Sequence, residues 1–238
     1  MWRNCQITVA ALVAGLHAPG TAPRLEPSPP GATCRPDPDG PPVARAAFPR
    51  ADTSAYVLPF EPGRAYLVWR STSHYTPGND GVGLYAVDVA MPVGTPLVAA
   101  RGGVVAAVRD TFPDGNDTDL HENYVMVRHP DGTVARYLHL TRRGALVAVG
   151  DSVRQGQRIA RSGNSGQTGG PHLHFDVQAC GPNLPPAYNR LPCGRTVPVA
   201  FRNAGPNPCG LVPGRSYRAR PPRSVPRARR AGSASLGV

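Results

Sequence analysis

The residues in this sequence best suited to chemistry are two histidines, His172 and His174, separated by one residue. Successive residues of a β-strand point to opposite faces, so residues two apart share a face. If this segment is a strand, both imidazoles lie on one side of it. Two imidazoles on one rigid face are a common way to build a metal or proton-transfer site. A His-x-His pair alone is weak evidence, and a structural role for both residues stays open.

Two further histidines stand in segments that could contribute to such a site. His139 lies in the alternating segment 136–140, and His74 lies in a polar, glycine-containing stretch, 73–78. Imidazole serves both as a metal ligand and as a general base. Taken alone, His139 is equally well explained as a partly exposed residue at a strand end, and His74 as an ordinary loop residue.

Asp88 is the carboxylate with the most unusual surroundings. It lies within the apolar run 85–91, which has the composition of a strand. Burying a carboxylate costs free energy unless the group is paired or bound to a metal. Asp88 is therefore a candidate metal ligand, and a salt bridge to one of the arginines is the alternative.

The elements that must position these residues are short strands. From about residue 55 to 205, apolar runs are punctuated by Gly, Pro, Asn and Asp, which predicts a compact antiparallel all-β domain. No long segment has the 3.6-residue period of a helix. Asp131-Gly132 between two runs predicts a hairpin turn. The expected strands are 65–69, 84–90, 104–109, 124–129, 133–139, 158–160 and 172–178.

The flanks differ from this segment in composition. Pro (29) and Gly (27) are abundant, and the Pro-rich region predicts a disordered linker over 23–54. The net charge is +11, and the chain has no Lys. Arginines without acidic neighbours are concentrated near the C-terminus, so we expect a disordered Arg-rich tail over 206–238. The composition excludes a helical bundle, a coiled coil and a multi-domain enzyme, and no transmembrane segment is expected.

The N-terminus and the cysteines bear on the compartment. The apolar run 7–16 follows Arg3 and has the length of a signal-peptide hydrophobic region, so a signal peptide over 1–22 is predicted, with an ordinary disordered leader as the alternative. An exported chain, in the periplasm, cell envelope or outside the cell, permits disulfides. We favour a Cys180–Cys193 pair, which would close a Pro-rich loop and contribute about 3 kcal/mol of stability. The other cysteines that would remain are Cys34 and Cys209.

Taken in order along the chain, these motifs resemble the lysostaphin/LytM-type zinc metalloendopeptidases, which cut peptidoglycan cross-bridges. The resemblance covers roughly residues 55–205, and its motifs fall in the family's order, which is far more specific than a single His-x-His. The matching segments are YAVDVAMPVGTP (85–96), AARGGVV (99–105), NYVMV (123–127), YLHL (137–140), GDSV (150–153), GNSG (163–166) and GPHLHF (170–175).

The resemblance implies one zinc ion bound by His74, Asp88 and His174. The other two histidines, His139 and His172, would form an unliganded catalytic pair. Two nitrogen ligands and one oxygen ligand leave a fourth tetrahedral position. The implied function is a zinc-dependent endopeptidase that hydrolyses peptide cross-links of bacterial peptidoglycan through a metal-activated water. The catalytic pair would position the water, accept its proton and stabilise the oxyanion, in roles that stay unassigned between the two.

In one respect the sequence departs from the family pattern. The family often places its first His and its Asp only four residues apart, whereas many more residues separate His74 from Asp88 here. Asp80 lies closer to His74 and stays open as the ligand, although the sequence context favours Asp88. We expect the inserted segment, 75–84, to form one wall of the substrate groove.

Two other functions compete with the enzyme. A non-catalytic LytM-type factor would bind and activate a cell-wall amidase, but such relatives usually lose metal ligands, and all five expected side chains are present. A lipoyl or biotinyl carrier is excluded because the chain has no acceptor Lys. We expect a monomer with a peptidoglycan peptide as substrate and no nucleic-acid partner.

Overall fold

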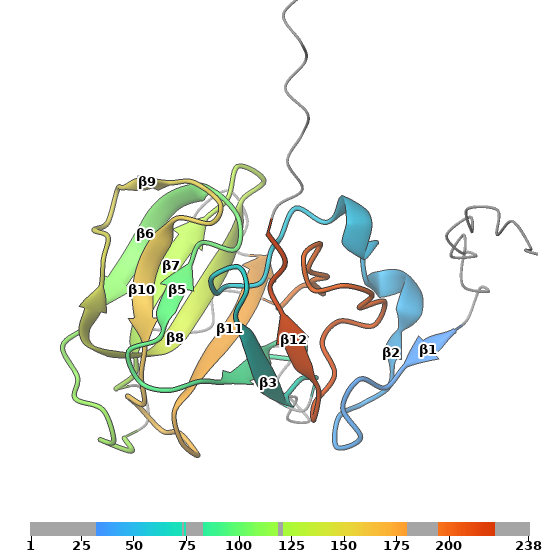
Figure 1. Ribbon diagram of the computed structural model, residues 1–238, viewed down its shortest axis with the longest axis horizontal. Helices are drawn as coiled ribbons and strands as arrows, with labels where there is room; N and C mark the ends of the chain where they lie inside the picture. Colours follow the sequence, from blue (N-terminus) through green and yellow to red (C-terminus); the bar gives the residue numbers. More distant parts are fainter. Residues whose placement is uncertain (1–31, 73, 75–82, 119–120, 180–194, 222–238) are drawn as a thin grey trace, which may run out of the picture.

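The structure is a computed structural model that describes residues 32–72, 74, 83–118, 121–179 and 195–221. Nearly all of its regular structure is β-strand (Figure 1). None of the helices in these ranges is long and apolar enough to cross a membrane. In chain order the elements are β1 (Thr33–Cys34), β2 (Val43–Ala44), η1 (Arg45–Ala47), η2 (Ala51–Thr53), β3 (Ala65–Arg70), β4 (Val87–Ala90), β5 (Pro96–Val98), β6 (Gly103–Arg109), β7 (Asn123–Arg128), β8 (Thr133–Ala145), β9 (Ser152–Val153), β10 (Arg158–Ser162), β11 (His172–Ala179) and β12 (Ser216–Arg218).

One antiparallel sheet organises the domain. Its strands follow the order β12-β3-β4-β11-β8-β7-β6-β9, and β10 pairs with both β8 and β5. Strands β4 and β11 are therefore interior strands of the sheet, with neighbours on both sides. The predicted compact antiparallel all-β domain of the LytM type is confirmed, with a sheet that is not closed into a barrel.

The main core joins the sheet to the segments that cover it. It contains Tyr137 and Phe175 from the sheet, Leu97 and Ile159 from β5 and β10, and Phe201 from the C-terminal region. Each of these side chains is almost fully buried. Such burial is the main source of stability for a domain of this size. The core thus fixes the sheet whose other face carries the histidines.

Strand β7 shows how closely local sequence and packing agree. Val125 and Val127 belong to the main core, whereas Tyr124 and Met126 pack in a second cluster on the opposite face. Because both faces are covered, the strand is apolar without a polar alternation. The predicted turn at Asp131-Gly132 joins β7 to β8, and Gly132 has the positive φ, 80°, that this turn requires.

The N-terminal flank differs from the disordered linker expected over 23–54. In its described part, β1 and β2 pair as an antiparallel ribbon, and Cys34 forms a disulfide with Cys209. The strands have only two residues each, so no periodicity in the sequence could reveal them. The predicted signal peptide and the favoured Cys180–Cys193 pair lie outside the described residues and stay predictions.

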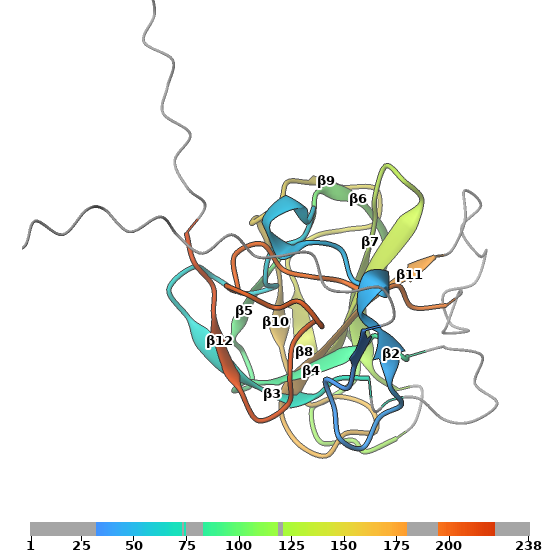
Figure 2. The ribbon, with the colours of Figure 1, turned by 90° about the vertical axis from the view of Figure 1, so that its right-hand side faces the viewer.

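The expected Arg-rich tail, 206–238, also contains structure in its described part. Strand β12 pairs with β3, and the two lie side by side in Figures 1 and 2. Tyr217 is 5% exposed and belongs to the main core, and its hydroxyl accepts a hydrogen bond from the Val212 N–H. The part of the tail up to this strand therefore belongs to the domain.

Replacing Tyr217 tests that conclusion. Tyr217→Ala removes a buried aromatic ring and is expected to cost about 3 kcal/mol of unfolding free energy, or about 6–12 °C in the melting temperature. Ser216→Ala is the matched control, because Ser216 is exposed on the same strand. Equal melting temperatures for the two variants would show that β12 is not part of the folded domain.

Candidate metal centre

Two residues far apart in the sequence meet because they are partners in the sheet. Asp88 in β4 lies directly opposite His174 in β11. Directly opposite side chains point to the same face, with Cβ atoms about 4.5–5.5 Å apart. His174 Nδ1 lies 3.0 Å from Asp88 Oδ1. The register of one strand pair therefore creates the centre of the site.

The third member, His74, comes from the segment that follows β3. Its Nε2 lies 2.8 Å from Asp88 Oδ2, and its ring centroid lies 4.9 Å from that of His174. Ligand atoms of His74, Asp88 and His174 all lie within 4.8 Å of one another. The ligands of one tetrahedral zinc ion lie about 3.3–3.5 Å apart. The donor set and its spacing fit a single divalent ion.

The inserted segment does not separate His74 from this group. Gly83 has a φ of 80°, and a Cβ atom there would lie 3.3 Å from the Cβ of His74. Residues 74 and 83 are therefore in contact, although eight residues separate them in the sequence. Asp80, the open alternative to Asp88, lies outside the described residues.

Charges around Asp88 favour a cation. Burial alone would raise the pKa of the Asp88 carboxyl, but hydrogen bonds with His174 and His74 hold it well below its usual range. Burial would lower the pKa of His174, yet hydrogen bonds to Asp176 and Asp88 raise it to about 9. Two carboxylates thus stabilise positive charge at the His174 ring. The same field favours a divalent metal ion.

The hydrogen bonds of His174 show which of its nitrogens carries a proton. Its Nε2 lies 3.1 Å from Asp176 Oδ2, and a carboxylate can only accept, so Nε2 carries a proton. In the neutral ring, Nδ1 then holds a lone pair that faces the ionised Asp88. Two lone pairs at 3.0 Å repel unless a cation lies between them. Either a proton or a metal ion satisfies that requirement.

His172 and His139 lie beside this group. Their ring centroids are 4.6 Å apart, and His172 Nε2 lies 3.6 Å from Asp88 Oδ1. His172 shares a strand face with His174, as the sequence predicts. His139 has a φ of 61°, in the left-handed region that residues with a side chain seldom adopt. Such strain is typical of functional positions.

The irregular backbone of His139 has a structural cause. Strand β8 pairs with β11 up to Leu138 and with β10 from Leu140 onward. His139 lies at the point where β8 exchanges one partner for the other. Its side chain is thereby released from the strict alternation of the strand and joins the histidine cluster.

Backbone carbonyl groups fix the orientation of both rings. His139 Nδ1 donates to the Ser165 carbonyl, and His172 Nδ1 donates to the Gly170 carbonyl, each at 2.8 Å. Since Nδ1 carries the proton, Nε2 of each neutral ring holds a lone pair. Burial, reinforced by His172 and His174, lowers the pKa of His139 to about 3, and burial also lowers the pKa of His172. Both rings are neutral at pH 7.

Sequence reasoning did not assign Asp176 and Arg136 to the site. They are opposite partners in β11 and β8, with Arg136 Nε 2.8 Å from Oδ1 and Nη2 2.5 Å from Oδ2 of Asp176. Both are buried. Asp176 continues the every-second-residue series that begins with His172 and His174, and this spacing was the available signal. The pair holds the carboxylate that orients His174.

Asp176→Asn is expected to weaken zinc binding about 10- to 100-fold, the usual effect of losing a carboxylate that orients a ligand histidine. Competition with a chromophoric chelator measures the affinity, and circular dichroism checks the fold. Asp52→Asn is the matched control, since Asp52 forms a similar two-pronged pair with Arg50 on the surface. An unchanged dissociation constant for folded Asp176→Asn would contradict this role.

Comparison with known proteins finds similar sequences among bacterial peptidases. Residues 83–186 match the sequence profile of Peptidase family M23. The chain is 35% identical over 139 residues to the peptidoglycan DD-endopeptidase ShyA of Vibrio cholerae, covering 58% of this chain and 28% of that protein. It is 40% identical over 103 residues to the glycyl-glycine endopeptidase ALE-1 of Staphylococcus capitis, covering 42% and 26%.

A solved structure of lysostaphin from Staphylococcus simulans aligns with 48% of this chain and 42% of its own, at 30% identity and a TM-score of 0.37. Residues 83–186 of the chain thus match peptidase family M23, the lysostaphin/LytM-type family that its motifs resemble. The matched regions span less than a third of the length of the two curated relatives.

Proposed function

We propose that this protein is a zinc-dependent endopeptidase that hydrolyses peptide cross-links of bacterial peptidoglycan. The observation that carries the proposal is the convergence of His74, Asp88 and His174 beside two neutral histidines. The match to peptidase family M23 supports a peptidase. The relatives' names, a peptidoglycan DD-endopeptidase and a glycyl-glycine endopeptidase, support a cell-wall substrate.

His74, Asp88 and His174 would hold one zinc ion. A set of two imidazoles and one carboxylate is typical of catalytic zinc, because three protein ligands leave a coordination position open. When bound, zinc supplies a Lewis acid that polarises a carbonyl group and lowers the pKa of water. Asp176 keeps the His174 ring in the tautomer whose Nδ1 lone pair faces Asp88.

His139 and His172 would act as general base and general acid. Each ring is anchored through Nδ1, so each can accept a proton at Nε2 from an attacking water and pass one to the departing amine. A ring that has gained a proton also stabilises negative charge on the carbonyl oxygen. Because burial lowers the pKa of both rings, both are neutral beforehand and Nε2 of each is free of a proton at neutral pH.

The proposed substrate places the protein outside the cytoplasm, in the periplasm, the cell envelope or the medium. The Cys34–Cys209 disulfide supports an oxidising compartment. A single chain supplies all five side chains, which supports action as a monomer.

Substitutions at the site separate metal binding from proton transfer. His174→Ala is expected to lose both zinc and activity, whereas His139→Ala keeps zinc and loses about 10²- to 10⁴-fold in rate. His121→Ala is the control, because His121 lies outside the cluster against Phe112. Elemental analysis gives the zinc content, and mass spectrometry of digested sacculi, with and without chelator, gives the activity.

Two results would redirect the proposal. Purified protein that binds no zinc would eliminate the metalloenzyme. Protein that binds zinc, leaves sacculi uncut and stimulates a cell-wall amidase would support the non-catalytic alternative instead.

Trp69 supplies an apolar surface beside the catalytic pair. It is 41% exposed on β3, and its ring centroid lies 5.8 Å from that of His172. A Cβ atom on Gly170 would lie 3.3 Å from its ring, so the turn before β11 supports one edge of the indole. We propose that the exposed part of the ring contacts substrate next to the cleaved bond.

Trp69→Ala is expected to raise KM about fivefold with little change in kcat, the effect of losing about 1 kcal/mol of aromatic contact. Trp69→Phe should retain most of the affinity. Leu67→Ala is the control, because Leu67 is 39% exposed on the same strand, two residues away. The test is the Michaelis constant for a soluble cross-linked muropeptide. Equal values for Trp69→Ala and wild type would show that Trp69 does not contact the substrate.

A further inference from the structure

His74 differs from the other histidines of the cluster in how its ring is held. The second nitrogen of His174 is bonded to Asp176, and the Nδ1 atoms of His139 and His172 are bonded to backbone carbonyls. His74 Nδ1 is buried and has no hydrogen-bond partner among the described residues. Apart from the contacts of the ring with Asp88 and His174, its position therefore depends on the backbone that carries it.

That backbone is held by the N-terminal segment 32–48, called here the N-terminal brace. Asp37 is 3% exposed, and its Oδ2 accepts a hydrogen bond from the Ser71 N–H at 3.1 Å. Its other oxygen accepts from the Asp39 N–H at 3.0 Å, which closes the turn of the brace itself. One carboxylate thus joins the brace to the residues that lead into His74.

The backbones of the two segments also touch. A Cβ atom on Gly40 would lie 2.6 Å from the Thr72 carbonyl oxygen, so only glycine permits this approach. Ser71 and Thr72 are both buried and lie between the end of β3 and His74. The brace therefore fixes the chain two residues before the ligand.

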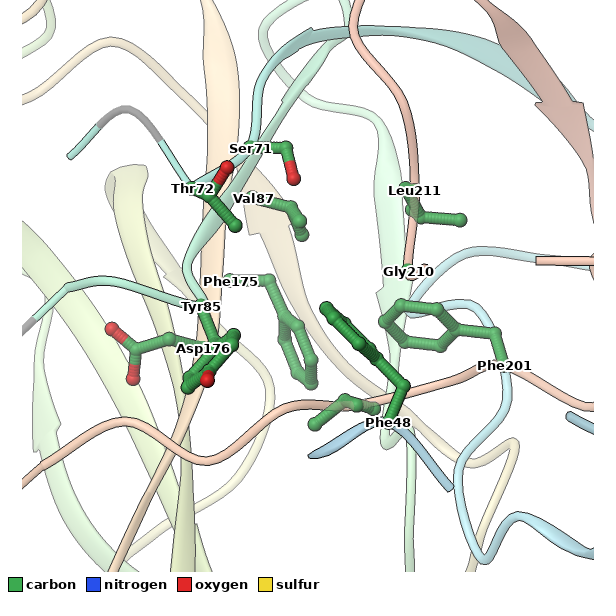
Figure 3. A pocket seen from close by; sticks show the side chains of 11 residues that line it. Phe48, Ser71, Thr72, Tyr85, Val87, Phe175, Asp176, Phe201, Gly210 and Leu211 are labelled. Atoms are coloured by element: carbon green, nitrogen blue, oxygen red, sulfur yellow. The ribbon is translucent and has the colours of Figure 1, made fainter. Parts of the chain in front are cut away.

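The brace contacts the other end of the inserted segment as well. Phe48 packs edge-to-face against Tyr85, with ring centroids 5.6 Å apart, and Tyr85 precedes Asp88 by three residues. Figure 3 shows Phe48 and Tyr85 among the side chains around a small cavity that Ser71, Thr72 and Asp176 also line. The brace thus contacts the chain on both sides of residues 74–84: at Ser71 and Thr72 before them and at Tyr85 after them.

A covalent bond keeps the brace in this place. Cys34 in β1 is joined to Cys209, and both belong to one cluster with Phe48 and Tyr85. Gly210 packs directly beneath Phe48, because a Cβ atom there would lie 2.8 Å from its ring. The disulfide therefore attaches the brace to the C-terminal segment that covers the sheet.

We propose that the N-terminal brace is a positioning element of the metal centre, with Asp37 as the residue that fixes Ser71 and hence His74. This inference rests on the proposed metal site. Ordering one backbone residue changes an equilibrium constant about 5- to 30-fold. By ordering the approach to His74 before metal arrives, the brace raises the affinity for the ion.

Metal affinity in the full-length, disulfide-bonded protein tests the proposal. Asp37→Ala is expected to weaken zinc binding about 5- to 30-fold and to change the visible absorption spectrum of the Co²⁺-substituted protein. Asp37→Asn keeps an oxygen acceptor for only one of the two N–H groups and should fall between Asp37→Ala and wild type. The double variant Cys34→Ser/Cys209→Ser should weaken binding in the same direction.

Asp52→Ala is the matched control, since Asp52 lies shortly after the brace and, among the described residues, pairs with exposed Arg50. It is expected to keep wild-type affinity and the wild-type Co²⁺ spectrum. Melting temperatures of all variants separate lost folding from lost positioning, and Asp37→Asn supplies the comparison if Asp37→Ala does not fold.

The outcomes are distinguishable. If the folded Asp37 and cysteine variants melt at lower temperature but bind zinc with wild-type affinity and an unchanged Co²⁺ spectrum, the brace serves stability alone and the proposal is overturned. If wild-type protein binds no zinc, the proposed metal site and the brace's role are overturned together.

Discussion

The structure of this site depends on one buried carboxylate, Asp88. It lies opposite His174, whose Nε2 is already hydrogen-bonded to Asp176. Asp176 accepts the proton of His174 Nε2, so only a second positive charge, a proton or a metal ion, can join Nδ1 to Asp88. Burying such an arrangement costs free energy unless a positive charge joins the two groups. His74 brings a second imidazole to the same carboxylate. The sheet has thus brought together a group of side chains that requires a positive charge among them.

The sheet also sets the orientation of the rings around that carboxylate. Three of the four histidines have one nitrogen tied to a fixed acceptor, either a backbone carbonyl or Asp176. Groups held in this way need little reorganisation during a reaction, which is the main advantage of a rigid site. The left-handed backbone of His139 also helps to orient its ring. This residue lies where β8 exchanges β11 for β10 as its pairing partner.

The segments around the family domain are part of this molecule's architecture. The matched region begins at residue 83, so the segment carrying His74, the brace and β12 all lie outside it. The inserted segment lengthens the connection between His74 and Asp88, and Gly83 returns the chain to His74. A longer connection costs more entropy to order. Asp37 contacts Ser71 shortly before this connection, and Phe48 contacts Tyr85 near its end.

The sequence by itself determined the fold class and the strands that carry Asp88 and the His-x-His pair, because alternation is a local property, and the resemblance of its motifs to a family implied the set of five candidate residues. Only the tertiary structure decided that Asp88 lies opposite His174, since register depends on how two distant strands pair. The same holds for the tautomers, which are set by carbonyl groups of Ser165 and Gly170. The disulfide-tied brace has no periodic signal, so its short strands and its contact with Ser71 became visible only when the chain was folded.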